Sequence, residues 1–118
     1  MTIHTRSQKL AQAAFARIAK YGKPGKEYVS FAKKFPALIH TCGLAQAVAF
    51  ALAKKEKEYV EDLAAVLKAS GHPEAGSADA LQKLTHDQPL SGYLRLSRDS
   101  INAAGWLKRY VEASGEDD

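Results

Sequence analysis

Apolar residues recur every three or four positions along most of this chain, and no long segment alternates strictly between apolar and polar residues. Alanine, leucine, lysine and glutamate dominate and β-branched residues are sparse, which favours helices over strands. The pattern predicts an all-α protein, a single compact bundle of five to six helices around a buried central helix. We expect one helical domain in residues 1–113 and a disordered acidic tail in residues 114–118.

The longest uncharged run, residues 35–53, contains no Asp, Glu, Lys or Arg. Its length is compatible with a membrane span. However, Pro36 disfavours a regular helix at its start, polar side chains interrupt it, and many of its residues are alanines, which are only weakly apolar. We therefore interpret it as a core helix of about residues 37–54, covered on nearly every side by other helices.

Glycine divides this central stretch, because Gly43 indicates either a bend or a point where another backbone comes close. Beyond it, apolar side chains are expected to face the core in several directions, namely Leu44, Val48, Phe50 and Leu52.

Helix-stop and capping signals delimit the remaining helices. The predicted helices span about residues 5–21, from after Gly25 to an end or kink near Pro36, then about 56–70, 78–86 and 90–113. Ser77 is the expected N-cap of the fifth helix. In the last helix, Leu90, Leu94 and Ile101 are expected to widen the apolar face.

Charge is distributed unevenly between the two halves of the chain. Residues 1–55 hold ten basic residues and one acid, whereas residues 56–118 hold seven basic residues and twelve acids. This asymmetry indicates either a polyanion or an acidic protein surface as the partner of the first half, or only a soluble surface whose halves neutralise each other.

Two helices place their cations in stripes. At 100° per residue, the first helix forms a stripe about 80° wide that consists of Arg6, Lys9, Arg17 and Lys20. The last helix forms a stripe about 60° wide that consists of Arg95, Arg98, Asn102 and Arg109. Such an array suits phosphate recognition, although every amphipathic helix has a charged outer face. Trp106 lies at the edge of the second stripe, where it suits either a protein–protein contact or stacking on a base.

Catalytic and metal-binding patterns are missing from the sequence. The four histidines are widely spaced, and His40 and Cys42 lie two residues apart, on different faces of a helix. We expect His40 to be hydrogen-bonded in or near the core, Cys42 to be a small buried residue, and the acids of the fourth helix to lie on solvated faces. We predict no enzyme activity, no metal and no cofactor. A single cysteine and the lack of a signal peptide predict a cytoplasmic location.

The central stretch also carries a family resemblance. It resembles the core signature of the small helical subunit of the type III-B CRISPR effector, the RAMP-module complex, in the pattern Tyr28-x-x-x-Ala32-Lys33-x-Phe35-Pro36-x-Leu38-Ile39-x-x-x-Gly43-Leu44-x-Gln46-x-x-Ala49-Phe50. An Arg near the start of the first helix, a Tyr-Leu pair that opens the last helix and a Trp-Leu-Lys-Arg motif agree with that family, here Arg6, Tyr93-Leu94 and Trp106-Leu107-Lys108-Arg109. The family pattern leads us to expect a polar residue at position 42, and Cys42 departs from it.

The resemblance implies a non-catalytic subunit that stacks in several copies along the backbone subunits of the complex. It also implies contact with the large subunit and with the groove where guide and target RNA pair. On stripe geometry the RNA-facing candidates are Arg6, Lys9, Arg17, Lys20, Arg95, Arg98 and Arg109, of which the motif supports only Arg6 and Arg109. A stand-alone helical nucleic-acid binder and a purely structural adaptor are the alternative functions.

Overall fold

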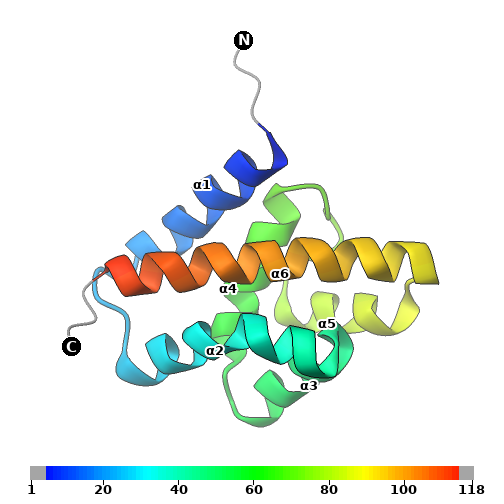
Figure 1. Cartoon of the computed structure of the whole chain (residues 1–118), viewed down its shortest axis with the longest axis horizontal. Helices are drawn as coiled ribbons and strands as arrows, with labels where there is room; N and C mark the ends of the chain where they lie inside the picture. The colour runs from blue at the N-terminus through cyan, green and yellow to red at the C-terminus, as the bar shows by residue number, and fades with distance from the viewer. Residues whose placement is uncertain (1–4, 115–118) are drawn as a thin grey trace.

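Six α-helices and no strand make up residues 5–114, the part of the chain that the computed structural model describes (Figure 1). The helices are α1 (Arg6–Ala19), α2 (Lys26–Cys42), α3 (Leu44–Ala53), α4 (Lys57–Ala69), α5 (Ala78–Asp87) and α6 (Leu90–Ala113). The predicted all-α bundle is therefore confirmed. Except for Ser114, the predicted acidic tail lies outside the described residues.

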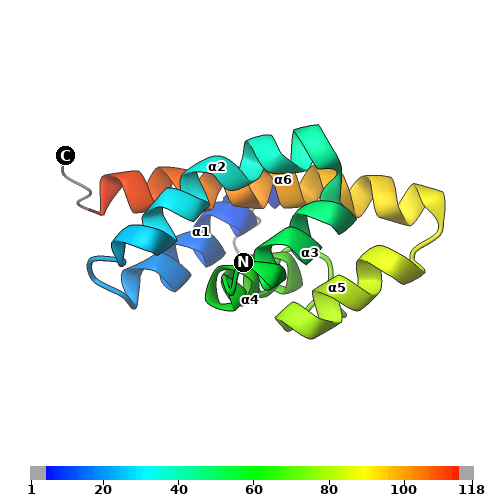
Figure 2. The same cartoon turned by 90° about the horizontal axis from the view of Figure 1, so that it is seen from below.

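The helices form a flattened body with extents of 42 × 41 × 21 Å. The longest helix, α6, runs across the molecule with α2 beside it, and α3, α4 and α5 lie on the opposite side of the body (Figures 1 and 2). Helix α1 packs against both α6 and α4. One outer surface of α6 is consequently left uncovered along its length.

Aromatic side chains occupy the centre of the core. Tyr59 and Phe35 are fully buried, with ring centroids 5.0 Å apart, and Tyr28 and Phe31 pack edge-on against Tyr59 at 5.7 and 5.5 Å. Rings at these separations and angles add specific contacts to the area that they bury. They join α2 to α4, so that the second and fourth helices share one core.

The central stretch does not form a single helix. Helix α2 continues through Pro36 to Cys42, and the chain breaks at Gly43, whose φ of 86° and ψ of 159° are accessible almost only to glycine. The predicted end or kink near Pro36 was wrong as a helix boundary. Proline removes one hydrogen bond from the helix, but Phe35 and Ile39, buried on either side of it, hold both parts of α2 against the core.

Some apolar side chains that we expected inside are outside. Leu44 and Val48 are buried, but Phe50 is 40% exposed although α3 packs against α2, α4 and α5. Leu90 and Leu94 are 74% and 56% exposed and do not widen the apolar face of α6. Because Phe50 is exposed, the description of residues 35–53 as covered on nearly every side was wrong.

The start of α3 depends on a side chain from α6. Gly43 offers no side-chain cap, and the backbone N–H of Ala45 instead donates a hydrogen bond of 3.0 Å to the Tyr93 hydroxyl. A Cβ at Gly43 would lie 3.6 Å from the Tyr93 oxygen, an ordinary contact. The glycine is therefore required for its backbone conformation and not for space.

Replacing Gly43 with alanine is expected to lower the free energy of unfolding by about 1–3 kcal/mol, the cost of holding a side-chain-bearing residue in this region. Urea unfolding followed by circular dichroism measures the change. Gly105→Ala is the matched control, because Gly105 lies inside α6 with open space at its Cβ, where alanine should stabilise by up to about 1 kcal/mol. Equal effects at the two sites would contradict the role of Gly43.

Candidate functional site

The outer surface of α6 carries the second predicted stripe. Arg95, Arg98, Asn102 and Arg109 are all exposed, whereas Leu96 and Leu107 on the opposite side of the helix are fully buried. We call these four residues the arginine stripe. Helix α6 runs across the whole body (Figure 1), and the stripe follows it from residue 95 to residue 109.

The cations of the first stripe, on α1 and at its C-cap, have a different environment. The Arg17 Nε donates a 2.7 Å hydrogen bond to the buried carboxylate of Asp62, and the Lys20 Nζ lies 3.6 Å from the same group. Arg6 pairs with the buried carboxylate of Asp99 at 3.3 Å. Three of the four cations of the first stripe therefore lie against acids of the protein itself, and Lys9 is exposed.

Asp62 connects three helices. Besides the Arg17 guanidinium of α1, its carboxylate accepts hydrogen bonds from the hydroxyls of Tyr21 at 2.6 Å and Tyr28 at 2.5 Å, the latter on α2. Burial and then the hydrogen bond to Asp62 raise the pKa of both tyrosines well above their usual range. The expectation of a solvated face was wrong for Asp62, which is completely buried.

Asp99 forms a second internal junction. Its carboxylate lies 2.7 Å from the His72 Nε2 and also meets Arg6, so it ties α6 to α1 and to the loop that follows α4. Both aspartates occur on the apolar spacing of their helices, three residues after Tyr59 and Leu96 respectively. That helical phase is the sequence signal that marks them as inward-facing.

An aromatic contact crosses from α1 to α6. The Phe15 ring meets Tyr110 edge-on at 5.5 Å, Tyr110 stacks on Trp106 at 5.7 Å with an angle of 22°, and the Arg109 guanidinium lies 5.7 Å over the Trp106 ring. We call Phe15, Trp106 and Tyr110 the aromatic seam. The structure thus places Trp106 beside the arginine stripe, as its helical phase predicted.

His40 and Cys42 are exposed. Both were predicted in or near the core, and both predictions were wrong, since these residues fall in the last turn of α2, on sides that the other helices leave uncovered. The exposure of Cys42 agrees with the polar residue that the family pattern led us to expect at that position.

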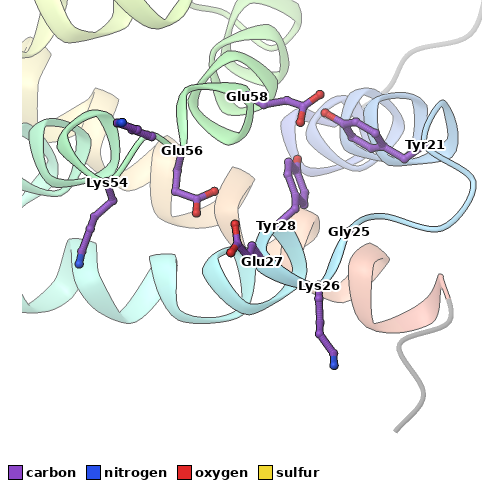
Figure 3. Close-up of a pocket in the computed structure, with 9 residues that line it drawn as sticks. Tyr21, Gly25, Lys26, Glu27, Tyr28, Lys54, Glu56 and Glu58 are labelled. Carbon is purple, nitrogen blue, oxygen red and sulfur yellow. The ribbon is translucent and has the colours of Figure 1, made fainter.

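An open hollow of about 610 Å³ lies between the start of α2 and the turn before α4 (Figure 3). The carboxylates of Glu27 and Glu56 point toward one another in it, whereas Lys26 and Lys54 point away. Burial and the charge of Glu27 raise the pKa of Glu56, and Lys34 partly offsets them. The remaining lining residues are Tyr21, Gly25, Tyr28, Lys55 and Glu58.

Metal-ligand geometry does not occur in residues 5–114, where no three His, Cys, Asp or Glu side chains converge on one point. Within the same residues, none of the helices has the length and apolar character needed to cross a membrane. The candidate functional surface is therefore the arginine stripe, which is cationic and runs along α6.

These features define a small all-helical protein with its helices tied together by buried carboxylates and with a line of arginines on its longest helix. The family model described as CRISPR-associated protein (Cas_Cmr5) matches residues 6–114. The chain belongs to this family, which confirms the resemblance seen in the sequence.

A named protein and a solved structure, both from Thermus thermophilus, are similar to this chain. The protein named CRISPR system Cmr subunit Cmr5 is 34% identical over 116 residues, which cover 94% of this chain and 96% of that protein. The crystal structure of a CRISPR-associated Cmr5 family protein superposes with a TM-score of 0.82 at 35% identity, over 96% of this chain and all of that one. The whole described fold is therefore shared with a solved member.

Proposed function

We propose that this chain is a non-catalytic small subunit of a type III-B CRISPR effector complex, where copies of it stack along the backbone filament and help to hold guide and target RNA. Family membership and the name of the Thermus relative, a Cmr subunit, support assembly into such a complex. The backbone and large subunits are the proposed protein partners.

The arginine stripe is the observation that carries the RNA-holding part of the proposal. Arg95, Arg98 and Arg109 project from one exposed helix face, and no acid interrupts that face among them, since Asp99 is turned inward to Arg6 and His72. A row of guanidinium groups on one face of a helix suits a chain of phosphates, because each contact releases condensed counterions.

The buried carboxylates divide the predicted RNA-facing residues into two groups. Arg17 and Lys20 are proposed mainly to secure α1 through Asp62, and Arg6 to do so through Asp99. Lys9 and the three arginines of α6 are the stronger candidates for RNA contact, because they are exposed and, among the described residues, do not lie against Asp62 or Asp99. Trp106 is proposed to lie in a protein–protein interface.

Replacing Arg95, Arg98 and Arg109 together with alanine is expected to weaken RNA binding at least tenfold and to reduce the slope of log affinity against log salt by about two to three, one for each lost phosphate contact. Fluorescence anisotropy with labelled single-stranded RNA and with an RNA duplex over a NaCl series measures both quantities.

The matched control replaces Lys57, Lys68 and Lys83, three exposed cations of α4 and α5, and removes the same charge. It should leave the slope nearly unchanged. An equal loss in both variants would mean that only net charge attracts RNA. No RNA binding by the native chain, together with normal co-purification with backbone subunits, would instead indicate a structural adaptor.

A further inference from the structure

Trp106 is in contact with two residues that follow it on α6. The Tyr110 ring stacks on the indole at 5.7 Å with an angle of 22°, and the Arg109 guanidinium lies 5.7 Å over the same ring. Residues three and four positions further on are the neighbours of a residue on the surface of a helix. The indole therefore meets an aromatic ring and a cation of its own helix.

Helix α1 supports this group through the aromatic seam. The Phe15 ring meets Tyr110 edge-on, with ring centroids 5.5 Å apart. Helix α1 packs along α6 and is attached to it by the ion pair of Arg6 with the buried Asp99. A continuous series of ring contacts consequently runs from α1 to Arg109 and restricts the motion of the indole between them.

The three arginines of the stripe are therefore not equivalent. Arg95 and Arg98 are exposed, and neither lies over an aromatic ring among the described residues. Arg109 is exposed as well, but its guanidinium is attracted to the indole face while its outward N–H groups remain available to a ligand. Immobilising a long side chain at an interface costs entropy, and Arg109 has lost part of that freedom before any ligand binds.

We propose that Trp106 is a positioning residue, which holds the Arg109 guanidinium ready for a bidentate contact with a phosphate of RNA. This inference rests on the proposed RNA role of the arginine stripe and names the residue on which one of its contacts depends. A guanidinium held in place matches two phosphate oxygens with its fork of donors. Trp106 is half-buried, so its uncovered edge stays available for the proposed protein contact.

Stacking of Trp106 on an RNA base is disfavoured by the same contacts. Base stacking uses an uncovered ring face, and the indole already has Tyr110 and Arg109 against it. Phosphates are present in single-stranded and duplex RNA alike, whereas the bases of a duplex are paired and stacked on one another. The positioning role therefore predicts the same effect of a Trp106 substitution on both forms of RNA.

Replacing Trp106 with leucine keeps an apolar side chain and removes the aromatic ring. RNA binding is expected to weaken about threefold, the size of one cation–π contact at a partly exposed site. The slope of log affinity against log salt should not change, because Arg109 keeps its charge, whereas Arg109→Ala should reduce that slope by about one. Trp106→Phe keeps a ring under the guanidinium and should stay within about twofold of the native affinity. Fluorescence anisotropy with the labelled single-stranded RNA and the duplex measures these values.

A double-mutant cycle separates positioning from packing. In an Arg109→Ala background, Trp106→Leu should change the affinity by less than about 1.3-fold, because the side chain that it positions is gone. In an Arg98→Ala background, the matched control, it should still cost about threefold, since the indole holds Arg109 and not Arg98. Thermal unfolding of Trp106→Leu checks that the variant is folded.

The contact also has a signature without RNA. In nitrogen-edited NMR spectra, the Arg109 Hε should lie upfield because of the ring current of the indole, and Trp106→Leu should abolish that shift while the Arg98 Hε stays in place. An Arg109 signal that does not move, a loss confined to single-stranded RNA, or equal losses in the two backgrounds would overturn the proposal and leave the RNA role of the stripe intact. No RNA binding by the native chain at low salt would reject the RNA role itself, and this inference with it.

Discussion

Replacing Asp62 with alanine is expected to lower the free energy of unfolding by about 3 kcal/mol. The change removes the acceptor of the Tyr28 hydroxyl, which is buried, and of the Arg17 guanidinium. A buried donor without an acceptor costs about 1–3 kcal/mol. The loss falls at the lower end of the range for broken buried ion pairs because the Arg17 side chain is 33% exposed and regains water.

Urea unfolding of the variant and of the native chain gives this difference. Glu61→Ala is the matched control, since it removes the neighbouring carboxylate from the same turn of α4, where Glu61 is only half-buried. It should change stability by less than about 0.5 kcal/mol. Similar losses in the two variants would contradict the role given to the hydrogen bonds of Asp62.

The number and type of helices could be predicted from the sequence because helical periodicity and capping residues are local signals. Ser77 caps α5 through the Ala80 N–H at 3.1 Å as predicted, and α6 begins and ends where its Pro89 and apolar pattern indicated. The boundary at Pro36 was wrong because burial of Phe35 and Ile39, a tertiary effect, outweighs one lost hydrogen bond.

Helical phase also predicted the arginine stripe and the position of Trp106 at its edge. Phase describes one helix at a time, however, and does not show which residue of another helix lies opposite. Arg17 and Arg98 look alike in the sequence, yet only Arg17 meets a buried carboxylate, because α4 packs against that side of α1. The exposed Leu90 and Leu94 were missed for the same reason.

The internal pairing changes the meaning of the charge asymmetry. Part of the basic excess of residues 1–55 is used inside the protein, where Arg6, Arg17 and Lys20 meet acids from the second half of the chain. The halves therefore neutralise each other at the contact between them, and the arginines of α6 remain exposed. Mutual neutralisation therefore accounts for part of the basic excess of residues 1–55, and a polyanion or acidic protein partner stays a prediction.

Strong alkali is expected to unfold this protein through its buried tyrosines. Burial raises the pKa of Tyr59 and of Tyr28 far above the value of about 10 that they have in the unfolded chain, and the Asp62 carboxylate raises that of Tyr28 further. The folded state therefore keeps both protons while the unfolded state releases them. Stability is complete below about pH 10 and is lost as the pH rises above it.

Each of the two tyrosines costs about 1.4 kcal/mol per pH unit above 10, so that together they remove about 3 kcal/mol by about pH 11. Circular dichroism and tyrosinate absorbance should change together in one transition. Tyr59→Phe tests the cause, because the Tyr59 hydroxyl has no hydrogen-bond partner among the described residues and its removal should cost nothing at neutral pH. The variant's midpoint should move to higher pH, since one ionisation no longer favours the unfolded chain. An unchanged midpoint would mean that tyrosine ionisation does not drive the transition.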